Sequence, residues 1–297
     1  MQLDALAARK PFEALHFCRS LLELCKPRIT RMVVITAWLG AVIAPGPVRW
    51  ASLVVTLVGT SLIVAGANAL NMALEADADA LMKRTRERPV PAGRISAELA
   101  ILFSVGIAVL GYAVLARWGN PVCSVLAVGA FLAYAFIYTP AKRHSAYALH
   151  IGAVPGAIPP LIGWASTQGT LSWASLSLFL ILFIWQLPHF MAIALFRVAE
   201  YERAGFQVYP TVKGVPRTER AMMHWSALLA IAGLLPWAFG LANGVYAAVA
   251  LLLGAGFFAL VAFGRKWLQA ERYARTVFFA SIPYLVLSLG ALALTAQ

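Results

Sequence analysis

Nine long apolar runs, separated by short polar segments, constrain what this 297-residue chain can fold into. An apolar run of roughly 18 or more residues predicts a transmembrane helix, because about 20 residues rising 1.5 Å each cross the hydrocarbon core. The runs are continuous rather than alternating, which disfavours a membrane β-barrel. The sequence therefore predicts an all-α polytopic membrane protein with spans at residues 29–45, 51–72, 99–116, 122–140, 146–165, 171–196, 222–242, 246–264 and 276–295.

The excess of 24 Lys and Arg over 12 acids reflects membrane topology rather than nucleic-acid binding. When the basic residues are assigned to alternating sides of the nine spans, 22 lie on one side and only Arg49 and Arg117 on the other. Cytoplasmic loops of membrane proteins carry this excess. We therefore expect a multi-pass protein of the bacterial plasma (inner) membrane, with its N-terminus in the cytoplasm and its C-terminus outside.

The polar segments divide the chain into an N-terminal segment and one membrane domain. Residues 1–28 mix apolar and charged residues and are typical of an amphipathic helix on the cytoplasmic membrane surface. Residues 29–297 form a single nine-helix domain, whose outer connections are very short. Only the inner loops 73–98 and 197–221 are long and rich in ionisable groups, so we expect the active site at the cytoplasmic face.

The first inner loop begins in the stretch "NALNMALEADADALMKRTRERPVPAGR", residues 68–94. Asn71, Glu75 and Asp79 are spaced i, i+4, i+8, which places them on one stripe where the second span leaves the membrane. An amide and two carboxylates offer the oxygen ligands that Mg²⁺ prefers, with substrate phosphates completing its shell. The donors that follow are suited to phosphate oxygens: Lys83, Arg84, Arg86 and Arg88. The alternative is a surface loop whose acids and bases neutralise one another, but the stripe and its position favour a magnesium-diphosphate site.

Two further stretches carry polar groups near the same face. "FIWQLPHFMAIALFRVAEYERAGFQVYP", residues 183–210, places His189 within a span, and a continuing helix would put Glu200 on its face with Arg197 nearby. An intramembrane ionisable residue is a functional candidate, whereas a structural histidine and a membrane-surface arginine are the alternatives. "YTPAKRHSAYALHIGAVPGAIPPLIGW", residues 138–164, begins with Tyr138 and Lys142, an aromatic anchor and a basic turn. Its many Gly and Pro residues predict close helix packing and bends.

These three stretches resemble the intramembrane UbiA-type aromatic prenyltransferases, and in particular their heme O synthase branch. The resemblance covers nearly the whole chain, from "KPRIT" at residues 26–30 to the ninth span. It implies a helical bundle around an intramembrane cavity that opens at the cytoplasmic face. The first loop is similar to the Asn/Asp-rich motif of the superfamily, while "YTPAKRHS", "GAVPGAIPPLIGW" and "WQLPHFMAIALFRVAEYERAGF" are similar to the heme O synthase branch.

The resemblance also implies roles for individual residues. Mg²⁺ is the implied cofactor, held by Asn71, Glu75 and Asp79, with Glu200 as a further ligand from the second loop. The diphosphate would be bound by Arg84 and Arg88, helped by Arg28, Lys83 and Lys142. Further contacts to the substrates would come from Tyr138, Arg197 and Glu200. His189 would lie near a heme substrate.

The implied reaction joins farnesyl diphosphate to a vinyl group of protoheme IX (heme B) with addition of water, giving heme O and diphosphate. Heme B is then a substrate rather than a permanent cofactor. The implied partners are these two substrates, the lipid bilayer, and a heme A synthase or assembly factors of heme-copper terminal oxidases; nucleic acid is not among them.

Three other functions are weighed against this one. A prenyltransferase acting on a quinone or another aromatic precursor would share the diphosphate site and differ only in its acceptor. A multi-pass transporter would place polar residues near the bilayer midplane, whereas here the charges gather at one face. A heme-carrying electron-transfer protein would need axial ligands on facing helices. Apart from His224 at the edge of the seventh span, only His150 and His189 lie within spans, both toward the cytoplasmic side, which makes a poor bis-histidine site.

Overall fold

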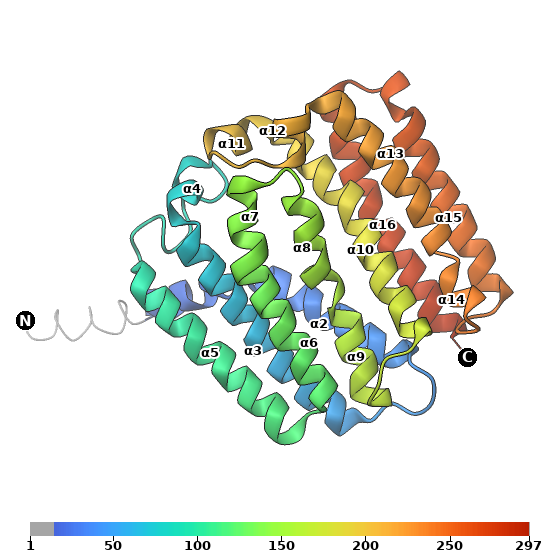
Figure 1. The fold of residues 1–297 in the computed structure, drawn as a ribbon, viewed down its shortest axis with the longest axis horizontal. Coiled ribbons are helices and arrows are strands. Elements are labelled where there is room, and N and C mark those ends of the chain that lie inside the picture. The colour runs from blue at the N-terminus through green and yellow to red at the C-terminus, as the bar shows by residue number, and fades with distance from the viewer. Residues whose placement is uncertain (1–14, 297) are drawn as a thin grey trace, which may run out of the picture.

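The structure is a computed structural model that describes residues 15–296, and in this part of the chain it is a bundle of helices without named strands (Figure 1). Residues 15–24 are helical, and residues 1–14 of the predicted amphipathic segment lie outside the described part. The remaining elements are α2 (Pro27–Ile43), α3 (Trp50–Leu74), α4 (Ala76–Leu81), α5 (Ala97–Trp118), α6 (Pro121–Leu132), the π-helix η1 (Ala133–Tyr138), α7 (Thr139–His144), α8 (Ala148–Ala157), α9 (Pro159–Gln168), α10 (Trp173–Phe196), α11 (Val198–Arg203), α12 (Tyr209–Lys213), α13 (Val215–Ala232), α14 (Leu235–Ala238), α15 (Gly244–Phe263), the 3₁₀ turn η2 (Gly264–Lys266) and α16 (Ala270–Thr295).

Eight helices in the described part of the chain are long and apolar enough to cross a membrane, and they match the second to ninth predicted spans. The first predicted span corresponds to α2, which has 17 residues. At 1.5 Å per residue it is somewhat shorter than the roughly 30 Å hydrocarbon core. The multi-pass helical fold is therefore confirmed, and the membrane crossing of α2 stays a prediction.

Several predicted helices are interrupted, and the interruptions shape the cytoplasmic end. The fifth span bends as predicted, because α8 ends at Ala157 and α9 begins at the Pro159–Pro160 pair. The sixth span ends at Phe196 as predicted, and the continuing helix that would have placed Glu200 on the face of His189 does not form. The backbone at Arg197 leaves the helical region (φ −121°, ψ 14°), so α10 ends at Phe196 and the short α11 follows.

Small residues allow α2 and α9 to cross closely, which places the start of α2 against the rest of the bundle. A Cβ atom on Gly163 would lie 1.6 Å from the carbonyl oxygen of Ala37, and one on Gly40 would lie 2.1 Å from that of Pro160. Small residues are common where membrane helices pack, because in lipid the association of helices depends on van der Waals contact between closely spaced backbones rather than on the hydrophobic effect.

The two predicted active-site loops lie at the same end of the bundle. Figure 1 shows α4, from the first loop, and α11 and α12, from the second, at one end, with α14 and the C-terminus at the other. The backbone amide of Gln207 in the second loop donates to the carbonyl of Lys142 at the end of α7 (2.7 Å). The fold thus gathers three sequence-distant polar segments at one end.

We expect Gly163→Ala to destabilise the protein by at least about 1–3 kcal/mol, because the added methyl group overpacks the α2–α9 contact. Gly106→Ala in α5 is the matched control, since nothing lies within 4 Å of its added Cβ and a helical Gly→Ala change is favourable by roughly 0.5–1 kcal/mol. Thermal denaturation in detergent measures both. Equal midpoints for the two variants would contradict the close packing.

Candidate active site

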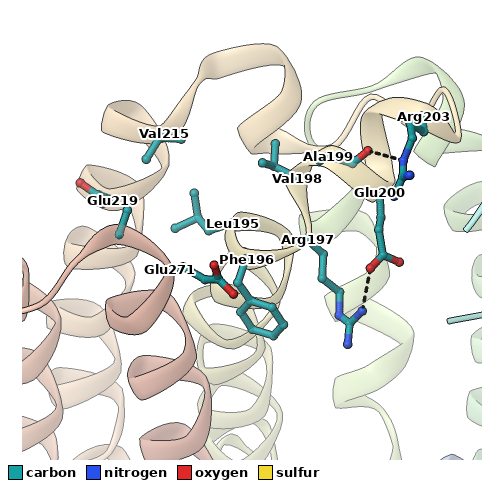
Figure 2. Close-up of a pocket in the computed structure, with 11 residues that line it drawn as sticks. Leu195, Phe196, Arg197, Val198, Ala199, Glu200, Arg203, Val215, Glu219 and Glu271 are labelled. Carbon is teal, nitrogen blue, oxygen red and sulfur yellow. Dashed lines mark hydrogen bonds and ion pairs between the residues drawn. The ribbon is translucent and has the colours of Figure 1, made fainter. Parts of the chain in front are cut away.

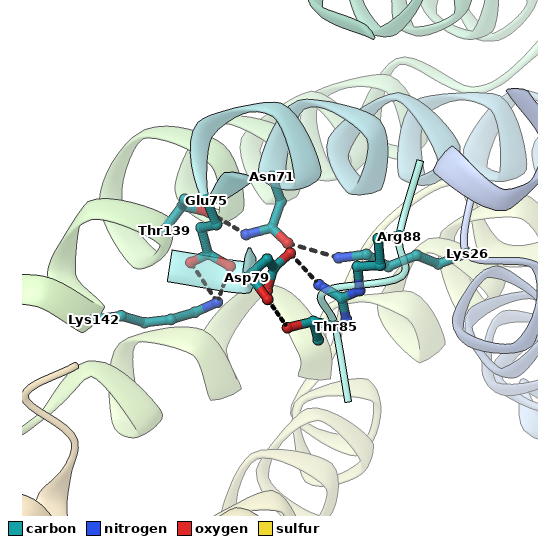
Figure 3. Close-up of polar contacts among 8 residues, drawn as sticks. All are labelled: Lys26, Asn71, Glu75, Asp79, Thr85, Arg88, Thr139 and Lys142. Atoms are coloured by element: carbon teal, nitrogen blue, oxygen red, sulfur yellow. Dashed lines mark hydrogen bonds and ion pairs between the residues drawn. The ribbon is translucent and has the colours of Figure 1, made fainter. Parts of the chain in front are cut away.

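Three oxygen-bearing side chains meet where α3 passes into α4. Asn71, Glu75 and Asp79 are 1%, 4% and 3% exposed. Glu75 interrupts the helix (φ −104°, ψ 10°), yet the amides of Glu75 and Asp79 still bond to the carbonyls four residues earlier, at 3.0 Å and 2.8 Å. The predicted spacing therefore survives the break, and the three side chains form one buried cluster (Figure 3).

Each member of this cluster is held by one basic side chain from another segment (Figure 3). The Lys142 ammonium lies 2.7 Å from Glu75 Oε1 and donates to Oε2 at 2.9 Å. Arg88 Nη1 donates to Asp79 Oδ2 at 2.6 Å. Removing either basic partner would leave a buried carboxylate unpaired, which is strongly destabilising.

Lys26 is the third basic partner, and the sequence analysis did not identify it. Its Nζ donates to Asn71 Oδ1 at 2.6 Å. Burial, together with the positive charges of Arg88 and Lys142, lowers the pKa of Lys26 from its usual 10.5 to about 7. The predicted neighbour Arg28, in the first turn of α2, is instead exposed.

The backbone explains how Lys26 reaches the cluster. Lys26 has φ +45°, and it is the one non-glycine residue of residues 15–296 with a positive φ. Such a conformation costs roughly 1–3 kcal/mol and persists where surrounding contacts enforce it. Pro27 starts α2 directly afterwards, and Asn68 donates to the carbonyl of Cys25 (3.4 Å) and to Thr30 Oγ1 (3.3 Å). The signal in the sequence was Lys26 before a helix-starting proline, but its orientation depended on α3.

The π-helix η1 positions the wall of the site. Asn71 Nδ2 donates to Thr139 Oγ1 (3.1 Å), whose hydroxyl donates to the carbonyl of Tyr134 five residues earlier (2.9 Å). The Lys142 ammonium lies 4.6 Å from the centre of the Tyr138 ring, a cation–π contact. That ring fits because Gly152 has no side chain, since a Cβ there would lie 2.5 Å from it. π-helical turns such as η1 occur frequently at functional sites.

The donor set of the cluster fits a hard divalent cation. Two carboxylates and an amide oxygen are the ligands that Mg²⁺ accepts from proteins, which leave its other positions to water and phosphate. Within residues 15–296, no three His, Cys, Asp or Glu residues lie close enough to hold a metal together. Glu200 therefore does not join Glu75 and Asp79, contrary to expectation, because the chain turns at Arg197.

Glu200 and Arg197 instead line a separate pocket of about 470 Å³ between α10, α11, α13 and α16 (Figure 2). Arg197 Nη1 lies 3.2 Å from Glu200 Oε1, and Glu200 Oε2 is buried without a hydrogen-bond partner. Acids from two other helices, Glu219 and Glu271, also line this pocket. Arg197 and Glu200, which were expected to lie near each other, thus form an ion pair in a pocket whose lining does not include the acid cluster.

The other predicted site residues lie at different places. Lys83 and Arg84 are exposed in the turn after α4, between the cluster and solvent. His189 faces α16, where its Nδ1 lies 2.7 Å from Ser281 Oγ. The structure thus brings together six of the predicted residues and adds Lys26 to them. The six are Asn71, Glu75, Asp79, Arg88, Lys142 and Tyr138.

The fold is similar to that of several solved membrane proteins. A digeranylgeranylglyceryl phosphate synthase matches with a TM-score of 0.80 and 16% identity, over 94% of this chain and 98% of the other. A UbiA homologue from Archaeoglobus fulgidus, bound to DMAPP and Mg²⁺, matches with a TM-score of 0.66 and 15% identity, over 92% and 99%. At these identities the likeness concerns the fold.

Sequence comparison identifies the family. A protoheme IX farnesyltransferase from Sorangium cellulosum is 48% identical over 82% of this chain and 86% of its own length. The model of the UbiA prenyltransferase family matches residues 33–282, which include the acid cluster, η1 and His189. The geometry of paired acids and bases at the end of a helical bundle, together with these matches, shows that the chain belongs to the UbiA prenyltransferase family.

Proposed function

We propose that this protein transfers the farnesyl group of farnesyl diphosphate to a vinyl group of protoheme IX, with addition of water, to give heme O and diphosphate. The observation that carries the proposal is the buried cluster in which Asn71, Glu75 and Asp79 each meet a basic side chain. The name of the relatives, protoheme IX farnesyltransferase, supports the choice of donor and acceptor.

The charge of the cluster suits a metal-bound diphosphate. When Lys26 is protonated, the three basic side chains Lys26, Lys142 and Arg88 carry three positive charges against the two carboxylates, so one positive charge is in excess. A divalent cation would raise this excess to three, which matches the charge of a fully ionised diphosphate ester. The basic side chains would then exchange their acid partners for phosphate oxygens, which are equally good acceptors of charge-assisted hydrogen bonds.

The reaction follows from this arrangement. Mg²⁺ at Asn71, Glu75 and Asp79 would supply positive charge opposite the departing diphosphate. Lys26, Lys142 and Arg88 stabilise the same developing charge as the bond between farnesyl C1 and oxygen breaks. A bond forms between C1 and the terminal vinyl carbon, water adds to the other vinyl carbon, and one proton leaves. The apolar helices keep water from the allylic cation until the carbon–carbon bond has formed.

Glu75→Gln and Asp79→Asn should each lower turnover by at least about 100-fold, because loss of one preorganised charge at a transition state costs this much. The matched control is Asp77→Asn, an exposed acid in the same loop, which should retain wild-type activity. Extracted hemes are analysed by chromatography and mass after incubation with heme B, farnesyl diphosphate and Mg²⁺. Full activity of the Glu75 and Asp79 variants in folded protein would refute the metal assignment.

Lys26→Met should raise the KM for farnesyl diphosphate by about 10-fold or more, since a hydrogen bond to a charged group contributes roughly 1.5–3 kcal/mol. Arg28→Met should change it little, because Arg28 is exposed and Lys26 contacts the cluster. Steady-state kinetics at saturating heme compares the two. A larger effect at Arg28 would restore the assignment based on family resemblance and remove Lys26 from the site.

We also propose that the protein lies in the plasma membrane with the acid cluster at the cytoplasmic face, as the distribution of Lys and Arg favours. Alkaline phosphatase fused after Ala296 should be active in a Gram-negative host, because nine crossings would put the C-terminus outside. The same enzyme fused after Gly93, in the first long loop, should be inactive. Activity after Gly93 together with inactivity after Ala296 would show that α2 does not cross the membrane, because eight crossings reverse the side of both positions.

A further inference from the structure

His189 has a single defined tautomer, because its partner has only one proton to give. Ser281 Oγ donates its hydrogen to the carbonyl of Phe278 at 2.6 Å. The same oxygen lies 2.7 Å from His189 Nδ1, so it must accept there, and Nδ1 carries the proton. The other ring nitrogen, Nε2, then holds a lone pair. A neutral imidazole with one N–H held by a protein oxygen and the second nitrogen unprotonated is the form in which histidine binds metals.

The ring of His189 is also fixed in orientation. Trp185 stacks on it at 4.7 Å with an interplanar angle of 26°, and Phe278 lies 4.9 Å away on a neighbouring helix. Trp185 Nε1 donates to the carbonyl of Ser281 at 2.7 Å, so one residue of α16 holds both rings. Among residues 15–296, the hydrogen bond that orients the ring is made by Nδ1 with Ser281.

An aromatic path connects His189 to the pocket of Figure 2. Phe278 contacts Phe196 at 5.8 Å, and Phe196 lines the pocket with Arg197. Phe196 is seven residues beyond His189 on α10, which is two helical turns and about 10 Å along the same face. The imidazole, the aromatic side chains and the pocket therefore follow one line along α10.

The pocket has cationic groups suited to carboxylates. Arg197 lies 5.4 Å from the Phe196 ring, and Arg275 lies 5.0 Å from it. Arg203 also lines the pocket, and its Nε donates to a backbone carbonyl rather than to an acid. Guanidinium groups recognise carboxylates by paired hydrogen bonds. The acids of the pocket have basic partners, since Glu219 pairs with Arg265, Glu271 with Arg275, and Glu200 with Arg197 itself. A propionate at Arg197 would therefore take the place of Glu200.

We propose that this line along α10 is the seat of the porphyrin acceptor, with His189 Nε2 as the axial ligand of its iron and Arg197 and Arg203 as the partners of its propionates. The inference rests on the proposed function for the identity of the acceptor. A protoheme has an apolar macrocycle, a central metal and two carboxylates on one edge. Along α10, from within the bundle toward its polar end, the aromatic side chains would contact the macrocycle, the imidazole would meet the metal, and the guanidinium groups would meet the carboxylates.

The first test is a titration of heme B into the full-length protein in detergent, without farnesyl diphosphate or Mg²⁺. Wild-type protein should give the absorption and electron paramagnetic resonance spectra of histidine-ligated heme. His189→Ala should lose them, and added imidazole should restore them. His189→Phe, which keeps the aromatic stacking, should lose them too if the Ala variant does not fold. Ser281→Ala should bind heme about 10-fold or more weakly, as expected for a group that orients a ligand.

His150→Ala is the matched control, because His150 also lies within a span but packs among Tyr147, Tyr209 and Trp225. Its spectra should equal those of the wild type. Unchanged spectra in folded His189 variants, or loss of the signal in His150→Ala alone, would overturn the inference while the proposed function stands if the wild type still makes heme O. A wild type that neither binds nor farnesylates heme would overturn both.

The second test replaces heme B by its dimethyl ester, which lacks the two negative charges. Wild-type protein should bind the diacid about 10-fold more tightly, and Arg197→Gln should remove this preference. Arg272→Gln, an exposed change on α16 that is outside the pocket lining, should keep it. Equal wild-type affinity for both hemes would show that the propionates do not bind at the pocket.

Discussion

The structure of the active end depends on buried charges that must be paired. Glu75 and Asp79 are almost fully buried beside a membrane span, where an isolated carboxylate would be prohibitively unfavourable. Their partners come from the turn after α4 and from α7, and the amide beside them binds Lys26 from the start of α2. Three separate segments are thereby tied to the end of α3, and these are the cations that the proposed function assigns to the diphosphate.

Packing elsewhere in the bundle makes these pairs possible. The close crossing of α2 and α9 at Gly40 and Gly163 fixes the position of α2, and thus of the strained Lys26 at its start. Gly152 leaves space for the Tyr138 ring, over which the Lys142 ammonium lies. Glycine residues outside the cluster therefore determine the positions of its charged side chains.

The acid cluster of Asn71, Glu75 and Asp79 and the proposed binding site of the acceptor lie on different helices of one bundle. The cluster belongs to α3, α4 and α7, whereas His189 and the arginine-lined pocket belong to α10 and its neighbours. The second loop connects the two sides, because Gln207 bonds to the backbone of Lys142, and Phe206 lies 5.8 Å from its ammonium. Under the proposed function, the diphosphate would bind on one side of this connection and the acceptor on the other.

The sequence by itself determined the membrane fold, eight of the helices and the core of the site, because apolar length and i, i+4 spacing are local properties. Asn71, Glu75 and Asp79 could be grouped in this way even though the helix breaks at Glu75. Only the tertiary structure decided which distant groups complete the site. It selected Lys26 over Arg28 by a left-handed backbone, separated Glu200 from the cluster by a turn at Arg197, and paired His189 with Ser281, 92 residues away. Such choices depend on helix packing and on the pairing of buried polar groups, which no local pattern encodes.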